Sequence, residues 1–146
     1  MLADNLLKLA DGLAVTDTDA LTTYSVDLGN VTPKREVGTG EPLCLVFSVG
    51  TAAAGSTDTS IFTAISSTAA SLDAGVLTLA ARTIANASLT AGSRHVVPIP
   101  PGSVTQRYIG GKIELGSGDT ITVDCHIMPE SMVGIFTNYA DNVTWS

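Results

Sequence analysis

Apolar and polar residues alternate with a period of two over much of this chain, most clearly in residues 95–115. His95, Val97 and Ile99 alternate with their neighbours, which indicates a strand and not a helix. Three prolines and a glycine follow and predict a rigid turn, because proline fixes φ and donates no backbone hydrogen bond. The pattern therefore predicts strand, proline turn and strand, the second strand covering residues 107–115.

The second of these strands has one apolar and one polar face. Its apolar face is expected to carry Ile109, Ile113 and Leu115, and its other face Tyr108, Lys112 and Glu114. The rigid turn would hold Arg107 and Tyr108 at a defined rim of the sheet. We therefore take Arg107 and Tyr108 as candidate partner-binding residues.

Two further stretches are predicted to be core strands. Residues 43–49 lie between glycines and are apolar on both faces, which is typical of a central strand. Residues 120–127 alternate, and their inward side chains are expected to be Ile121, Val123, Cys125 and Ile127. These two stretches and residues 107–115 should form the centre of the fold.

Weaker strand patterns fill most of the remaining chain. They cover residues 21–28, 61–67, 76–81 and 87–89, separated by stretches of small and polar residues. In the first of these, Tyr24, Val26 and Leu28 are expected to share one face. About eight short strands with turns between them predict an all-β fold, an antiparallel jelly roll or β-sandwich.

The two ends of the chain are less regular than the middle. Residues 1–20 have leucines at helical spacing, but the segment is equally consistent with an extended arm of short strand character, which we favour. The expected organisation is an N-terminal arm (1–20), one jelly-roll domain (21–127) and a C-terminal tail (128–146). A length of 146 residues suits a single domain with its own core.

Composition and charge argue against nucleic acid and membranes as binding partners. The seven basic and fourteen acidic residues give a net charge of −7, and only Lys34 and Arg35 are adjacent basic residues. Nucleic acid is therefore not expected as a partner, because phosphate binding requires clustered cations. No apolar run reaches the length of a membrane span, and Asp4 and Lys8 interrupt the N-terminal apolar residues, so neither membrane insertion nor a signal peptide is expected.

Candidate catalytic and metal-binding residues are few. Cys125 and His126 are neighbours on one predicted strand, so they point to opposite faces and do not share a zinc site easily. Asp124 and His126 share a face, but no nucleophile motif accompanies them, so an exposed polar row is favoured. We expect no catalytic residue, no metal and no cofactor.

The two cysteines are expected to be buried and reduced. A disulfide between Cys44 and Cys125 would require that their strands pair with close, correctly aimed Cβ atoms, and also an oxidising compartment. Free cysteine is among the most buried residue types, so the thiols are expected to pack in the interior.

Several turn and strand-entry motifs in order resemble one protein family. They are VDLG at residues 26–29, the GTGEPL strand entry at 38–43, AGSR at 91–94, PIPPG at 98–102 and RY at 107–108. Together these segments resemble the capsid cement, or decoration, proteins of short-tailed bacteriophages. The resemblance spans about residues 20–127, while residues 51–88 and the last twenty residues match poorly.

The resemblance implies a structural and non-enzymatic role. Proteins of this kind have a jelly-roll fold and bind the outer face of the assembled shell, where they staple neighbouring major capsid protein subunits. The chain would then be made in the host cytoplasm and carried on the virion, and would associate with itself, as a homodimer in preference to a trimer. The alternative from another class is a carbohydrate-binding jelly-roll module on a virion surface.

The C-terminal tail offers a second set of candidate partner-binding residues. Tyr139, Val143 and Trp145 place three apolar anchors within one short segment, and Trp145 is the only tryptophan. Tryptophan and tyrosine often dominate the energetics of protein interfaces. We expect this tail to dock on a neighbouring subunit rather than to fray.

Overall fold

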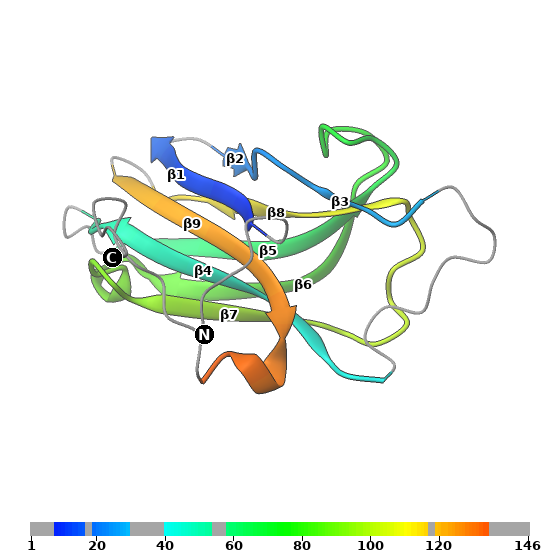
Figure 1. The fold of residues 1–146 in the computed structure, drawn as a ribbon. Helices are drawn as coiled ribbons and strands as arrows, with labels where there is room; N and C mark the ends of the chain where they lie inside the picture. The colour runs from blue at the N-terminus through cyan, green and yellow to red at the C-terminus, as the bar shows by residue number, and fades with distance from the viewer. Residues whose placement is uncertain (1–7, 17–18, 30–39, 54–57, 117–118, 135–146) are drawn as a thin grey trace, which may run out of the picture.

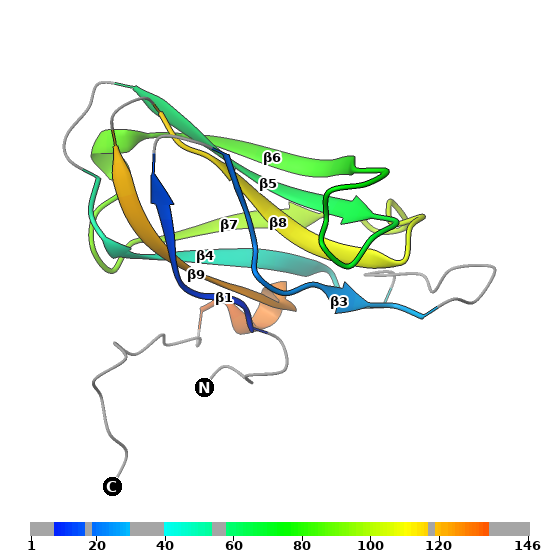
Figure 2. The same cartoon turned by 90° about the horizontal axis from the view of Figure 1, so that it is seen from above.

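Nine strands form two antiparallel sheets in the part of the chain that the computed structural model describes, residues 8–16, 19–29, 40–53, 58–116 and 119–134. One sheet has the order β1-β9-β4-β7 and the other the order β2-β8-β5-β6, with β3 also paired to β8. The two sheets face each other as the layers of a sandwich (Figures 1 and 2). The predicted all-β sandwich is confirmed.

The strands are of uneven length. The first sheet contains β1 (Lys8–Thr16), β9 (Thr120–Pro129), β4 (Leu43–Thr51) and β7 (Arg94–Ile99), and the second contains β2 (Asp19–Leu21), β3 (Val26–Asp27), β8 (Tyr108–Glu114), β5 (Thr59–Ser67) and β6 (Leu77–Ala85). Two single-turn 3₁₀ segments, η2 (Asn86–Ser88) and η3 (Glu130–Met132), are the helical elements of the described residues.

The strand pairing is that of a jelly roll, a long hairpin rolled into two sheets. The β5–β6 connection is the tip of this hairpin. Outward from the tip, β5 pairs with β6, β4 with β7, β2 and β3 with β8, and β1 with β9. Two further pairings, β4 with β9 and β5 with β8, then join neighbouring hairpin segments within each sheet. All of these pairs are antiparallel.

The core lies between the sheets and is centred on two aromatic rings. Phe47 and Phe62 are fully buried, with ring centroids 4.9 Å apart. Gly111 of β8 lies opposite, and a Cβ built there would be 3.0 Å from the Phe47 Cζ atom. The absence of a side chain at Gly111 therefore gives the Phe47 ring its space between the sheets.

The three predicted core strands are present, and their faces are as expected. Apolar residues of β4 are buried on both faces, and Ile109 and Ile113 of β8 point into the core. The four inward residues predicted for β9 are also in the core. Hydrophobic periodicity therefore located the central strands correctly.

The domain begins earlier than predicted. Lys8–Thr16, assigned to an N-terminal arm, is a full strand of the first sheet, and it buries Leu9, Ala10 and Val15 in the core. Two register shifts against β9 interrupt its alternation, which explains why the sequence pattern was ambiguous. At the other end, β9 extends to Pro129, two residues beyond the expected boundary.

Two weaker strand predictions were wrong. Residues 87–89 belong to a 3₁₀ turn and its cap, and the strand before them is longer than predicted, because β6 pairs with residues 59–66 of β5. Residues 21–28 are not one strand but hold the last residue of β2 and the two residues of β3. Between these strands the Thr22 hydroxyl accepts a hydrogen bond from the Gly111 amide and donates one to the Tyr24 carbonyl. This local break turns Tyr24 outward, where it is 61% exposed, while Val26 and Leu28 pack on the core as expected.

The proline turn does not join neighbouring strands of one sheet. β7 belongs to the first sheet and β8 to the second, so residues 100–107 cross from one layer to the other. Ser103 closes the turn on the carbonyl of Pro100, and Gly102 has a φ of 74°. Val104 is buried and packs against the core.

Candidate functional site

Three inter-strand connections meet at one end of the sandwich, on the right in Figure 1. They are residues 28–29 after β3, the β5–β6 loop (residues 68–76) and the β7–β8 crossing (residues 100–107). Arg107, predicted as a partner-binding residue, lies here at the start of β8. The predicted rim is therefore a real feature, assembled from segments that are far apart in sequence.

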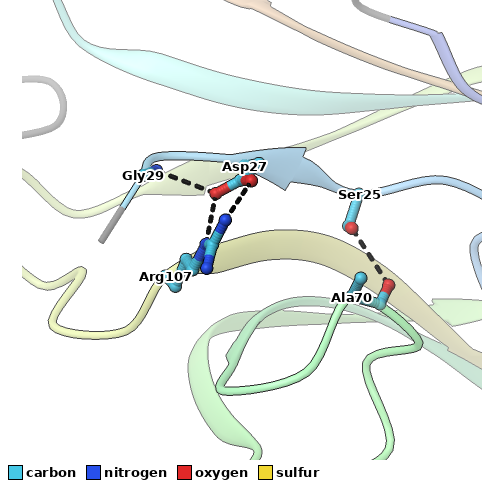
Figure 3. A network of polar contacts seen from close by, with 5 residues as sticks. All are labelled: Ser25, Asp27, Gly29, Ala70 and Arg107. Carbon is cyan, nitrogen blue, oxygen red and sulfur yellow. Dashed lines mark hydrogen bonds and ion pairs between the residues drawn. The ribbon is translucent and has the colours of Figure 1, made fainter.

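The central contact of this end is an ion pair between Asp27 and Arg107. Arg107 donates from Nε to Asp27 Oδ1 at 2.7 Å and from Nη2 to Asp27 Oδ2 at 2.8 Å (Figure 3). This bidentate arrangement fixes the plane of the guanidinium as well as its position. The bond to Asp27, together with the charges of Asp27 and Tyr108, raises the pKa of Arg107, although partial desolvation opposes the shift.

Backbone hydrogen bonds hold the two partners in place. The amide of Gly29, which has a φ of 82°, donates to Asp27 Oδ1 at 2.8 Å, and the amide of Leu28 donates to the Arg107 carbonyl at 2.8 Å. The positive φ favours glycine, because other residues rarely adopt this conformation. The carboxylate is thus oriented by its own turn before it meets the guanidinium.

The β5–β6 loop is fastened to the same region. Ser25 donates to the Ala70 carbonyl at 3.0 Å (Figure 3), and Ser67 donates to the Ala74 carbonyl at 2.6 Å. Leu72 is buried despite a φ of 63°, and a Cβ built on Gly110 would be 2.1 Å from its Cδ1 atom. The bare surface of β8 at Gly110 therefore receives the Leu72 side chain and keeps the loop against the sheet.

One aromatic side chain contacts the ion pair, and another is exposed on the segment that leads to it. The guanidinium carbon of Arg107 lies 5.0 Å from the centre of the Tyr108 ring, within the range of a cation–π contact. Tyr24 lies three residues before Asp27 and exposes 61% of its surface. We call this set of residues the β3–β8 rim: Tyr24, Ser25, Asp27, Gly29, Arg107 and Tyr108.

The sequence identified only part of the rim. Arg107 and Tyr108 were predicted from their place after the proline turn, but Asp27 was not, because nothing local in the sequence indicates that it meets Arg107 eighty residues away. Tyr24 was predicted to share a face with Val26 and Leu28, but those two residues pack on the core and Tyr24 is exposed. The other candidates, Tyr139, Val143 and Trp145, lie outside the described residues, so their role stays a prediction.

The opposite end of the sandwich contains a buried polar network. Ser60 donates to Asn86 Oδ1 at 2.5 Å, Asn86 donates to Asp119, and the Gly116 amide donates to the Ser60 hydroxyl at 3.0 Å. Ser60, Asn86 and Asp119 are at most 2% exposed. The network joins the start of β5, the segment after β6 and the connection between β8 and β9. Asn86 begins an Asn-Ala-Ser glycosylation sequon, but here its side chain is buried and structural.

The histidines are packing residues in this fold. His95 points into the core, 5.7 Å from the Phe62 ring, and Nε2 lies 3.1 Å from the Ser93 hydroxyl. His126 is only 3% exposed, so the expected exposed row of Asp124 and His126 is wrong for the histidine. Asp124 accepts a hydrogen bond from the Gly12 amide at 2.6 Å. Burial is the main cause that lowers the pKa of both histidines.

The cysteines lie on opposite faces of the first sheet. Cys125 pairs with Phe47 and faces the core, whereas Cys44 pairs with Met128 and faces outward, under a small apolar cluster with Val46. Both are buried free thiols, so pairing of β4 with β9 does not bring them into disulfide geometry. Burial raises the pKa of the Cys44 thiol to about 11, which keeps it protonated and unreactive near neutral pH.

No group of three or more His, Cys, Asp or Glu side chains converges within the part of the chain that the structure describes. Over the same residues, no helix is long and apolar enough to cross a membrane. The polar side chains of the rim instead pair with one another at the surface.

Comparison with known proteins places the chain in a family. A search of curated proteins finds no match. The family model for Bbp16, however, matches residues 9–124, well over half of the 146 residues. The matched segment begins in β1 and ends in β9, so it includes both sheets and the ion pair of the rim. The chain therefore belongs to the Bbp16 family, a family of phage proteins.

Proposed function

We propose that this protein is a capsid decoration protein that binds the outer surface of a phage shell and bridges neighbouring major capsid protein subunits. The observation that carries the proposal is the β3–β8 rim, in which the bidentate Asp27–Arg107 pair fixes an exposed surface at one end of a jelly roll. Membership in a phage protein family and the motif resemblance to capsid cement proteins support the same role.

A rim of this kind suits attachment to a rigid lattice. Binding is stronger when the contact surface is already ordered, because fewer side chains lose freedom on association. Arginine and the aromatic residues are also enriched where protein interfaces have their largest energies. The rim offers Tyr24 as an exposed aromatic anchor, and Arg107 is held in a defined orientation by Asp27 and contacts the Tyr108 ring.

Shells that lack this protein provide the test. The full chain is added to purified shells and the bound fraction is measured by co-sedimentation, and the heat resistance of decorated and bare shells is compared. We expect saturable binding at a fixed ratio to the shell protein and a higher disruption temperature. Equal heat resistance with and without the bound protein would contradict the stapling role.

Two variants identify the contact surface. Tyr24→Ala and Asp27→Asn should each weaken binding by about tenfold or more, since a hot-spot truncation costs roughly 2 kcal/mol. The matched control is Asp19→Asn, because Asp19 is an exposed carboxylate that pairs with Lys112 at 3.2 Å on the same sheet. Normal binding by both rim variants would remove the rim from the proposal. Binding to a glycan array but not to shells would favour the carbohydrate-binding alternative.

A further inference from the structure

Each sheet of this sandwich has two edges, and an unprotected edge can pair with another strand. Three of the four edges carry protective features. β1 has two register shifts against its partner and the Lys8–Asp11 ion pair, β7 has six residues that include Pro98, and β2 and β3 have only three and two residues. Bulges, charges, proline and short length each discourage pairing with a further strand.

The fourth edge, β6, is different. It has nine residues, LTLAARTIA, with no proline, and Arg82 is its only charged residue. Six of the nine residues are exposed, and Leu77 exposes 46% of its surface. One register shift against β5 occurs near Leu79, and residues 80–85 run in regular register. β6 is therefore as long as β1 but carries fewer protective features, which makes it the least protected edge of the described sandwich.

We propose that β6 pairs with β6 of a second copy of this chain, antiparallel and about a two-fold axis, so that the second sheet continues across the dimer. This inference rests on the edge alone and does not depend on attachment to a capsid. It specifies the surface through which the chain would associate with itself. A closed two-fold pair covers both edges at once and leaves no β6 edge exposed.

Symmetry and charge select the register of this pairing. A two-fold axis perpendicular to the sheet keeps each side chain on its own face, and directly opposite residues of an antiparallel pair also share a face. The residue at the axis must therefore lie opposite the same residue of the second copy, and not opposite its neighbour in sequence. An axis at Arg82 would oppose two guanidinium groups, and like charges directly opposite each other are destabilising. An axis at Ala81 allows all nine residues to overlap and places Arg82 opposite Ala80 of the second copy.

The full-length chain can be tested by sedimentation equilibrium. The wild-type chain should have twice the chain mass of 14.9 kDa, and Ala81→Lys and Ala81→Glu should each sediment at the chain mass. Ala81 is exposed in the single chain, so both variants should fold, which circular dichroism checks. The control is Thr120→Lys, an exposed substitution on β9 that should leave the dimer intact.

Mixing the two variants makes the test specific for the register. The lysine introduced in one copy would face the glutamate introduced at the same position in the other, so an equimolar mixture should recover the double mass. Hydrogen exchange of the wild-type chain gives a check without substitutions, because amides of β6 should become more protected as concentration rises. A monomeric or trimeric wild type, a dimeric Ala81→Lys variant, or a mixture that stays monomeric would overturn the proposal.

Discussion

The two ends of the sandwich are both held by polar contacts, which are exposed to solvent at one end and buried at the other. At the β3–β8 rim, Asp27 and Arg107 form an exposed ion pair whose side chains are 46% and 38% accessible. At the other end, Ser60, Asn86 and Asp119 form a network that is almost fully removed from water. The same types of hydrogen bond therefore act in two very different surroundings.

The difference determines what each end can contribute. An exposed ion pair is screened by solvent and is worth about 0–1 kcal/mol, so it orders a surface more than it stabilises the fold. A buried polar group that loses its partner costs roughly 1–3 kcal/mol, and more when it is charged. The network end should therefore determine stability, and the rim end should determine the shape that a partner meets.

Truncation of a core residue between the two ends should lower the free energy of unfolding more than a change at either end. Phe47→Ala should lower the free energy of unfolding by about 3–5 kcal/mol, because it removes a fully buried ring and leaves a cavity beside Phe62 and Gly111. Urea denaturation followed by circular dichroism measures the loss. A variant as stable as the parent would show that the sheets do not depend on this contact.

Loss of the buried network should have the next largest effect. Asn86→Ala leaves the Asp119 carboxylate and the Ser60 hydroxyl without their amide partner, and the free energy of unfolding should fall by about 2–4 kcal/mol. The same denaturation experiment measures it. If the loss were no greater than that of the rim variant Asp27→Asn, the contrast between the two ends would be wrong.

Lowering the pH should decrease the stability of the fold, because the two buried histidines have lowered pKa values. Burial, and also Arg82 for His95 and Lys8 for His126, lowers both pKa values below the ordinary 6.5, whereas Asp124 and Asp11 raise that of His126. The unfolded chain then binds protons that the folded chain does not, so stability is full above pH 6.5 and falls as the pH decreases through the lowered pKa values. Thermal unfolding between pH 8 and pH 5 should show this decrease.

A matched substitution separates the histidine effect from the titration of carboxylates. His95→Gln removes one of the two groups, so its unfolding temperature should depend less on pH than that of the parent over the same range. An identical pH dependence in the two proteins would remove His95 from this account.

The smallest effect on stability should come from the rim itself. Asp27→Asn removes an exposed ion pair, so the free energy of unfolding should change by less than about 1 kcal/mol. Thermal unfolding at low and high salt measures it, and the small loss should shrink further as salt is added. A loss comparable to that of Asn86→Ala would mean that the rim supports the fold as well as its surface.

The sequence by itself determined the fold class and the central strands. The double-sided apolar pattern of residues 43–49 and the alternation in residues 107–115 and 120–127 are local signals, since side chains along a strand alternate between its faces. They correctly placed Phe47, Ile113 and Cys125 in the core. The turn motifs also indicated a jelly roll with Arg107 at a rim.

Only the tertiary structure decided which segments meet. It brought Asp27 to Arg107, Asn86 to Asp119, and residues 8–16 into the first sheet, and it separated the strands on either side of the proline turn into different layers. It also turned Tyr24 outward and buried His126. The physical reason is that strand pairing joins residues distant in sequence, and its register decides the neighbours of each side chain, whereas periodicity reports only the alternation within one strand.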